Sequence, residues 1–259
     1  MGRTIYMIQL KTEEQIDGIR KSCHLVAWLM EEVGKFLKPE ITTHDIDKFC
    51  YDFTIGHGAK PAYLNFDGFP ATACISVNEE VIHGIPSKDK RIHEGDLVDL
   101  DLGTNLDGYF SDMSRTFVIG GKTDPKWQKL NDVTAECLQL GMDAAEKPHA
   151  RIQDIGAAVF KHADAYHYGV VRDYCGHGVG LAVHEDPEIP NYTSPMMPNP
   201  RIREGMVLAI EPMINLGTKN IRTMPNGWTV VTADGLPSSH WENTVAITKN
   251  GFEVLTVTD

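Results

Sequence analysis

Paired cysteines and long apolar runs are both missing from this sequence. The cysteines are odd in number, form no Cys-x-x-Cys pair and stand at positions 23, 50, 74, 137 and 175. This pattern argues against a disulfide framework or a cysteine-based zinc finger, and a reducing cytoplasm is the expected compartment. The opening segment "MGRTIYMIQLKTEEQ" becomes charged after too few apolar residues for a secretory signal or a membrane-spanning helix, so no membrane partner is expected.

Positive charge is scarce as well. The 259 residues include 36 acidic and 24 basic side chains, which gives a formal net charge of −12. This excess of acid argues against a nucleic acid or an anionic membrane as the main partner, because both are negatively charged. A chain of this length buries a large core, either as one domain or as two modest ones.

What the sequence does contain is the same order of predicted elements twice. Helical spacing of apolar residues, with a Thr12–Gln15 capping box at its start, predicts a long amphipathic helix. A second helix and segments of period-two alternation follow it, and this order recurs in the second half. The predicted helices cover residues 11–37, 43–56, 124–145 and 151–169, and the predicted strands cover residues 71–84, 95–103, 205–214, 227–233 and 242–248.

Short identities support an internal duplication. The segment "RIHEGDLVDLDLG", which begins at residue 91, matches "RIREGMVLAIEPM", which begins at residue 201. This alignment sets Asp101 opposite Glu211, and a looser match of "VIHGIP" with "AVHEDP" sets His83 opposite His184. Chance recurrence of Arg-Ile-x-Glu-Gly before a strand is the alternative. A real duplication predicts two half-domains around a pseudo-twofold axis, with their acids and histidines facing each other.

Carboxylates occupy strand positions where a core is expected. In the strand predicted at 95–103, Leu100 and Leu102 share one face, and Asp99 and Asp101 share the other. A chain reversal centred just before Asp107 sets Asp101 directly across from Asp112, whereas a turn on the Asp-Gly pair shifts this register. Two opposed carboxylates, with Cβ atoms about 5 Å apart, repel each other unless a proton or a cation lies between them. A solvent-exposed acidic hairpin is the alternative.

Two further acids and one histidine complete a possible metal site. Glu211 stands in the almost continuously apolar segment "MVLAIEPMI", where an unpaired carboxylate is costly, and Glu242 begins a similar strand. With His177, the four acids and one imidazole form a set that holds two divalent ions when two carboxylates bridge them. Such donors suit manganese, iron, cobalt or zinc. A buried ion-pair network is the structural alternative, and Arg115 is the nearest basic candidate for it.

The segment "CGHGVGLAVHEDPEIP" contains two histidines, His177 and His184, among three glycines. Each glycine costs about 1 kcal/mol in a helix interior, so the two histidines are not a helical metal pair. On a strand, their odd separation puts the two rings on opposite faces unless a turn or a bulge intervenes. The repeat pairs His184 with His83, which favours different roles for His177 and His184.

The ordered landmarks "DLD", "SDMSRTF", "GHGVG", "HEDP", "EP" and "WENT" resemble those of methionine aminopeptidases of the type I, bacterial kind. The resemblance runs along nearly the whole chain. It implies an α+β architecture, the pita-bread fold, with two pseudo-symmetric α/β halves around a central antiparallel sheet. The halves, about 12–120 and 121–259, would form one catalytic domain over residues 1–259. The segment between His177 and Glu211 is too short for the helical insertion of the type II enzymes.

The resemblance also implies roles for individual residues. The matched metal ligands are Asp101, Asp112, His177, Glu211 and Glu242, of which Asp112 and Glu242 bridge two divalent ions. Glu211 would also be the general base toward a water that bridges the metals, and the catalytic histidines His83 and His184 would touch the substrate. The matched substrate pocket comprises Phe66, Phe69, Cys74, His83, His184 and Trp228.

The activity implied by this resemblance is removal of the amino-terminal methionine from peptides and nascent proteins whose second residue is small. The expected partner is a chain beginning with methionine, with an association with the ribosome, no direct contact to nucleic acid and a monomeric enzyme. A proline-specific aminopeptidase or dipeptidase is one alternative, although it normally carries an extra amino-terminal domain. A non-catalytic binding protein on the same fold is the other, and it is expected to have lost metal ligands.

Overall fold

The computed structural model describes residues 7–258, so the predictions made for the start of the chain lie largely outside the described residues. Four α-helices occur in this range: α1 (Glu13–Phe36), α2 (Thr43–Gly56), α3 (Pro125–Glu146) and α4 (Ile152–Ala165). They correspond to the four predicted helices, and none is long and apolar enough to cross a membrane. Two short 3-10 helices, η1 (Phe66–Gly68) and η2 (Ile119–Gly121), lie between strands.

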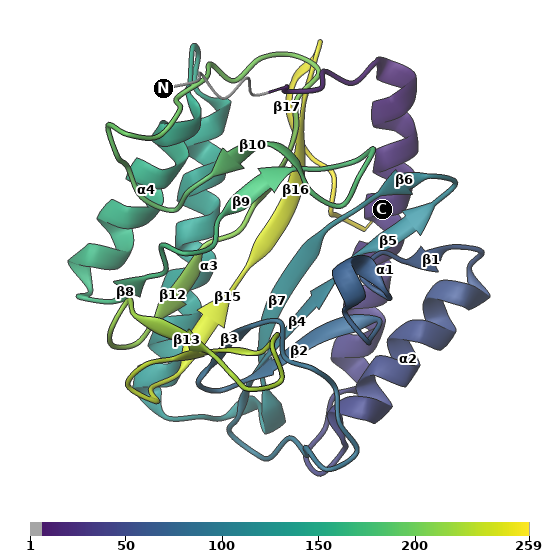
Figure 1. Cartoon of the computed structure of the whole chain (residues 1–259), viewed down its shortest axis with the longest axis vertical. Helices are drawn as coiled ribbons and strands as arrows, with labels where there is room; N and C mark the ends of the chain where they lie inside the picture. Colours follow the sequence, from purple (N-terminus) through teal and green to yellow (C-terminus); the bar gives the residue numbers. More distant parts are fainter. Residues whose placement is uncertain (1–6, 259) are drawn as a thin grey trace.

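An eight-stranded antiparallel sheet runs through the centre of the described chain (Figure 1). Its hydrogen-bonded order is β10-β9-β11-β16-β7-β4-β2, and β17 pairs with β16. The strands are β2 (Ala73–Val77), β4 (Leu97–Leu102), β7 (Met113–Val118), β9 (Gly176–Gly178), β10 (Glu185–Ile189), β11 (Val207–Ile210), β16 (Glu242–Thr248) and β17 (Gly251–Val254).

Three small three-stranded sheets adjoin the central sheet, with the orders β1-β5-β6, β15-β12-β8 and β13-β14-β3. Their strands are β1 (Lys60–Pro61), β3 (Glu80–Ile82), β5 (Thr104–Leu106), β6 (Tyr109–Phe110), β8 (Gly169–Val170), β12 (Met213–Asn215), β13 (Ile221–Thr223), β14 (Val230–Thr232) and β15 (Ser238–His240).

The helices cover the two halves of the central sheet separately. The pair α1 and α2 packs on β2 and β4, whereas α3 and α4 pack on β10 and β11 (Figure 1). Each half has its own apolar cluster: Leu29 and Leu100 belong to the first, and Ile155 and Leu208 belong to the second. All four side chains are essentially inaccessible to water, which makes burial of this apolar surface the main stabilising contribution of each half.

Local details at the starts of two helices repeat between the halves. Asp45 and Asp154 each accept a hydrogen bond from the backbone N–H three residues earlier, at the starts of α2 and α4. The donors, Thr42 and Arg151, each form an isolated β-bridge with the arginine that opens one copy of the repeated Arg-Ile-x-Glu-Gly segment. The helix start and its link to the following strand are thus the same in both halves.

The predicted pairing of Asp101 with Asp112 is wrong. Asp101 lies directly across from Ser114, because the reversal is centred on Asp107 and Gly108. Both of these residues have positive φ values, 54° and 89°, as the type I′ turn of a two-residue hairpin requires. Asp112 therefore precedes β7 and lies diagonally from Asp101.

Some predicted elements are interrupted or shortened for local reasons. The strand predicted at 71–84 breaks at Asn78, which has a φ of 56°, and the strand predicted at 205–214 breaks at Pro212, which lacks a backbone donor. The strand predicted at 227–233 is reduced to β14, because the Asn226 side chain accepts from the N–H groups of Trp228 and Thr229 and holds a turn there.

Candidate metal centre and substrate cavity

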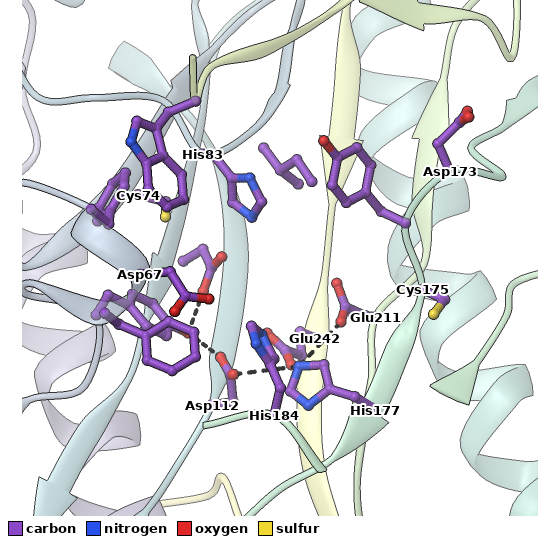
Figure 2. A pocket seen from close by; sticks show the side chains of 17 residues that line it. Asp67, Cys74, His83, Asp112, Asp173, Cys175, His177, His184, Glu211 and Glu242 are labelled. Atoms are coloured by element: carbon purple, nitrogen blue, oxygen red, sulfur yellow. Dashed lines mark hydrogen bonds and ion pairs between the residues drawn. The ribbon is translucent and has the colours of Figure 1, made fainter. Parts of the chain in front are cut away.

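Five neighbouring strands of the central sheet each contain one of the predicted metal-binding residues or lie next to it in the chain. In sheet order, the strand β9 carries His177, β11 ends just before Glu211, β16 begins with Glu242, β7 follows Asp112, and β4 carries Asp101. All five residues line the same cavity, whose volume is about 380 Å³ (Figure 2). The sheet order therefore brings together side chains that are far apart in the sequence.

The distances within this cluster suit the binding of cations. One donor atom from each of Asp112, His177 and Glu242 lies within 4.8 Å of the other two. The His177 Nε2 atom is 3.7 Å from Oδ2 of Asp112 and 3.5 Å from Oε1 of Glu211. These separations leave room for an ion among the donor atoms.

The four carboxylates of the cluster are buried, so four uncompensated negative charges would be unstable there. Burial and the charge of Asp101 raise the pKa of Asp112 well above its ordinary value, and burial and the charge of Asp112 do the same for the pKa of Glu242. Burial raises the pKa of Asp101 to about 7. The group is stable only when protons or cations compensate its charge.

Tyr63 adds a hydroxyl group to the cluster that the sequence analysis did not identify. Its buried hydroxyl donates to Oδ1 of Asp101 at 2.7 Å and also contacts Oδ1 of Asp112. A phenol has one proton, so it donates to only one carboxylate at a time. Because the Tyr63 proton is donated to Asp101, the contact with Asp112 is favourable only when the Asp112 carboxyl group carries a proton. A charged Asp112 would otherwise compete with Asp101 for the Tyr63 proton.

His177 is oriented as a metal ligand must be. Its Nδ1 atom lies 2.9 Å from the carbonyl oxygen of Gly178, to which the Nδ1–H group donates. Burial lowers the pKa of His177 to about 3, so the ring is neutral. The Nε2 lone pair then points toward the carboxylates, and a fixed tautomer of this kind is typical of metal-bound histidine.

One donor atom of the cluster has no protein partner. The Oε1 atom of Glu242 is buried without a hydrogen bond, although buried carboxylate oxygens in proteins are nearly always paired. Together with the neutral imidazole of His177, this atom fits a divalent ion with mixed oxygen and nitrogen donors.

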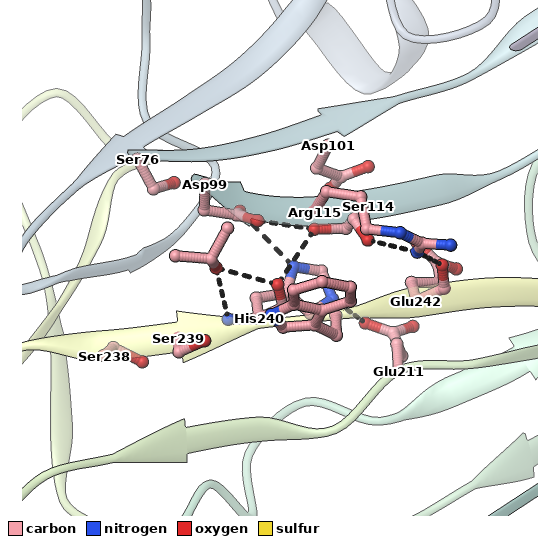
Figure 3. A network of polar contacts seen from close by, with 12 residues as sticks. Ser76, Asp99, Asp101, Ser114, Arg115, Glu211, Ser238, Ser239, His240 and Glu242 are labelled. Atoms are coloured by element: carbon pink, nitrogen blue, oxygen red, sulfur yellow. Dashed lines mark hydrogen bonds and ion pairs between the residues drawn. The ribbon is translucent and has the colours of Figure 1, made fainter. Parts of the chain in front are cut away.

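A second buried network backs the cluster and ends on Glu211 (Figure 3). His240 lies between two acids, with Nδ1 at 3.4 Å from Oδ2 of Asp99 and Nε2 at 3.4 Å from Oε2 of Glu211. Ser114 donates to the other oxygen of Asp99 at 2.5 Å. Burial lowers the pKa of His240, but the charge of Asp99 and the contacts with both acids outweigh it and raise the pKa well above the usual value.

The sequence contains one signal for this network. His240 precedes Glu242 by two residues in "SSHWENT", and period-two spacing puts both side chains on one face when the strand is continuous. The period-two spacing of Asp99 and Asp101 likewise indicates that both side chains lie on the same face of one strand. Nothing in the sequence pattern identifies Tyr63.

Arg115 forms no direct ion pair with a carboxylate of the cluster in the described part of the chain. Its guanidinium group donates to the backbone carbonyls of Ser114 and Glu242 and to Oδ1 of Asn243. It also lies over the ring of Trp241, 5.1 Å from the centroid. This arrangement weakens the alternative of a structural ion-pair network based on Arg115.

The residues predicted for the substrate pocket line the same cavity as the acid–histidine cluster (Figure 2). Aromatic rings form its apolar part: the centroids of Phe69 and Trp228 are 5.3 Å apart, and those of Phe66 and His184 are also 5.3 Å apart. The predicted members that line the cavity are Phe66, Phe69, Cys74, His83, His184 and Trp228. The cavity therefore has a polar part lined by acids and an apolar compartment lined by aromatic side chains.

A turn between β9 and β10 brings His184 back beside His177, although the odd sequence separation alone puts the rings on opposite faces. The two ring centroids lie 4.3 Å apart with the rings nearly perpendicular. Gly180 is required in this turn, because its φ is 128° and a Cβ atom there would lie 2.4 Å from Cδ1 of Ile19. His184 thus stands beside the cluster, and no described contact joins its ring to a carboxylate of the cluster.

His83 enters the cavity from a strained position in the chain. Its φ is 56°, in the left-handed region that residues with a Cβ atom rarely adopt. Burial, together with the charge of His240, lowers the pKa of His83 to about 4, so its ring is neutral. It faces Tyr174 and Trp228, with ring centroids 5.6 Å and 6.1 Å away.

The chain is similar to known metallopeptidases in sequence and in fold. A model of metallopeptidase family M24 matches residues 17–249. A methionine aminopeptidase of Treponema pallidum (strain Nichols) is 51% identical over 250 residues, which cover 96% of each chain. The crystal structure of methionine aminopeptidase from Rickettsia prowazekii has a TM-score of 0.92 at 37% identity and covers 97% of this chain and 100% of that one.

A prolidase from Pyrococcus furiosus is also similar, with a TM-score of 0.76 at 28% identity. This chain is covered to 96%, but it spans only 66% of the prolidase. The structural matches confirm the predicted α+β pita-bread fold, since nearly the whole chain is covered at TM-scores of 0.92 and 0.76. The chain belongs to metallopeptidase family M24 and, within it, to the methionine aminopeptidases of the type I, bacterial kind.

Proposed function

We propose that this metal-dependent aminopeptidase removes the amino-terminal methionine from peptides and nascent proteins, and that the acid–histidine cluster is its catalytic centre. One observation carries the proposal: five adjacent strands each bring one donor residue to a single cavity with an apolar compartment. The activity requires a polar centre for the scissile bond and an apolar compartment for the methionine side chain, and both are present within one cavity.

Two divalent ions, from among manganese, iron, cobalt and zinc, are proposed as the cofactors. The proposed ligands are Asp101, Asp112, His177, Glu211 and Glu242, with Asp112 and Glu242 shared between the ions. Divalent ions bound there supply positive charge that acidifies a neighbouring water and offsets negative charge developing on the substrate. The neutral His177 ring and the unpartnered oxygen of Glu242 support this assignment.

Glu211 is proposed as the general base. Its Oε1 atom faces His177 at 3.5 Å, while its Oε2 atom faces His240 at 3.4 Å. The raised pKa of His240 makes that ring the partner that restrains the carboxylate, whereas Oε1 faces the Nε2 lone pair of His177. The restrained carboxylate accepts a proton from the attacking water with little reorganisation. His240 restrains the carboxylate, and Asp99 in turn restrains His240.

His83 and His184 are proposed to contact the substrate. Both line the cavity, and neither ring contacts a carboxylate of the cluster among the described contacts. A neutral imidazole N–H donates a hydrogen bond to the scissile carbonyl oxygen as negative charge develops there. The low pKa of His83 keeps its ring neutral at physiological pH, which suits this role.

The compartment formed by Phe66, Phe69 and Trp228 is proposed to hold the methionine side chain, with Cys74 at its base. An unbranched thioether packs well against aromatic rings. The second substrate residue then lies near the cavity wall, so only small residues are accepted. We further propose one catalytic domain over residues 1–259, with halves 12–120 and 121–259, acting as a cytoplasmic monomer on chains that leave the ribosome.

A proline-specific peptidase is the competing function. The prolidase match supports this alternative only in fold and metal chemistry, because the chain spans 66% of that protein. A single assay separates the candidates: release of the first residue from Met-Gly, Met-Pro and Ala-Pro peptides with added manganese or cobalt. Methionine release from the first two supports the proposal, and preferred cleavage of Ala-Pro overturns it. No release from any peptide by metal-loaded protein favours a binding protein.

A further inference from the structure

A buried ion pair joins the start of the described chain to the loop that carries His184. The Lys11 Nζ atom lies 2.6 Å from Oε2 of Glu185, and the two side chains are 1% and 7% exposed. A nearby pair, Lys249 with Glu13, has the same 2.6 Å distance, but its side chains are 59% and 63% exposed. The two ion pairs therefore have the same N–O distance but differ in burial.

The second oxygen of Glu185 organises the loop itself. Its Oε1 atom accepts hydrogen bonds from the backbone N–H groups of Leu181, at 2.7 Å, and Ala182, at 3.1 Å. Glu185 directly follows His184 in the chain, so these bonds close the turn in which His184 lies. A single carboxylate thus uses one oxygen for the turn and the other for Lys11.

Lys11 is fixed at its own backbone. Its N–H group donates to the carbonyl oxygen of Gly205 at 2.7 Å, two residues before β11, and the capping residue Thr12 follows. The side chain therefore extends from a rigid attachment on the central sheet. Glu185 is 174 residues away in the sequence, and only the fold brings the two together.

The loop also contacts the cavity through residues other than His184. Val183 is buried against Phe69 and Cys74 in the apolar cluster of the compartment. The His184 ring packs edge-on against Phe66 and His177. A shift of this loop would move the His184 ring relative to the acid–histidine cluster.

We propose that Lys11 and Glu185 are positioning residues that hold the His184 ring in the position and orientation needed to contact the substrate. This inference rests on the proposed function of His184. An ion pair buried to this extent is not needed for stability alone, because a well-packed apolar pair of similar volume often stabilises a protein as much or more. What the ion pair supplies is a directional contact between the sheet and one turn.

The test compares Lys11→Met with Lys249→Met, the exposed control. The Lys11→Met protein should lose about 10- to 100-fold in kcat, since a displacement of about 1 Å at a catalytic group costs up to about 10²-fold. Its KM for a Met-Gly peptide and its manganese content after dialysis should stay close to wild type. Lys249→Met should leave all three quantities unchanged.

A second variant separates positioning from loss of charge. In Lys11→Met/Glu185→Gln, the glutamine carbonyl still accepts from Leu181 and Ala182, and no unpaired charge remains buried. This double variant should stay about as low in kcat as Lys11→Met, because the directional contact between the sheet and the turn is still missing. Recovery of most of the kcat would mean that the loss came from the unpaired charge of Glu185, and it would overturn the positioning role of Lys11. Glu185→Ala, which removes the acceptor, should not recover when Lys11→Met is added.

A double-mutant cycle with His184→Ala gives the decisive result. If Lys11 acts through His184, adding Lys11→Met to His184→Ala should cause no further loss of kcat. Full additivity of the two losses overturns the inference while leaving the role of His184 intact. If His184→Ala alone leaves kcat unchanged, the proposed role of His184 is the part that is wrong. Folding of each variant is checked by circular dichroism, and Glu185→Gln serves as a second variant should Lys11→Met not fold.

Discussion

Removing the imidazole of His240 should destabilise the metal-free protein more than the metal-loaded protein. His240 is 1% exposed and lies 3.4 Å from one oxygen of Asp99 and 3.4 Å from one oxygen of Glu211. Its raised pKa means that the ring is positively charged between two buried carboxylates. His240→Ala leaves both acids without this partner.

The size of the effect follows from these distances. At an effective dielectric constant of about 20, two unit charges 3.4 Å apart attract by about 5 kcal/mol, before the cost of desolvation is subtracted. Removing one member of a buried ion pair costs about 3–5 kcal/mol in practice. For a protein of this size that corresponds to a fall in Tm of roughly 6–20 °C. With metals bound, the ions compensate Glu211, so the loss should be smaller by at least about 1 kcal/mol.

Calorimetric unfolding with a chelator, and then with manganese, measures both values. His162→Ala is the control, because His162 also pairs with an acid, Glu136 at 2.7 Å, but both side chains are partly exposed and remote from the cavity. It should lose less than about 1 kcal/mol in either form. Asp99→Asn/His240→Gln, which replaces the charges by amides, should be more stable than His240→Ala. Equal losses for His240→Ala with and without metal would refute the reasoning.

Three further outcomes are expected. Activity should disappear with a chelator and return with manganese, cobalt or iron; full activity after verified metal removal would contradict a metal-dependent mechanism. His177→Ala should lower metal content and activity together, whereas His184→Ala should keep its metal and lose about 10²–10³-fold in kcat; metal analysis beside turnover decides this, and equal metal loss means that both rings bind an ion. Met-Gly peptides should be cleaved far faster than Met-Trp peptides, and equal rates would show that the cavity wall does not select the second residue.

Much of the fold could be predicted because the signals were local or repeated. The Thr12–Gln15 capping box forms as expected at the start of α1. The internal repeat sets Asp101 opposite Glu211; Asp101 lies in β4, Glu211 directly follows β11, and both line the cavity. Period-two spacing likewise placed Asp99 and Asp101 on one face of β4, opposite to Leu100 and Leu102.

The register of the first hairpin was harder to predict, because two adjacent turn centres were both chemically reasonable. The Asp107-Gly108 turn prevailed, since both residues adopt positive φ and the Asn105 side chain accepts from the Gly108 N–H at 2.9 Å. Contacts such as Lys11 with Glu185 were beyond prediction for a different reason. They join segments with no periodic relation, and only the tertiary structure sets their distance.

Tyr63 is the clearest case of a residue without a sequence signal, and it leads to a sharp prediction. Its hydroxyl lies between Asp101 and Asp112, in a segment with neither helical nor strand periodicity. Tyr63→Phe removes only that oxygen, so the carboxylates keep their packing but lose a partner that orients them. Hydrogen bonds to ligand carboxylates typically change metal affinity by about 10- to 100-fold, and a loss of that size is expected here.

Titration calorimetry of chelator-treated protein with manganese measures this change. Tyr174→Phe is the matched control, because Tyr174 lines the same cavity and its ring faces His83 instead of a carboxylate. Its metal affinity should match that of the wild type. Tighter binding in Tyr63→Phe would mean that the hydroxyl competes with the ions for Oδ1 of Asp101 and Asp112. The phenol would then protect the buried acids of the metal-free protein instead of preparing them for metal.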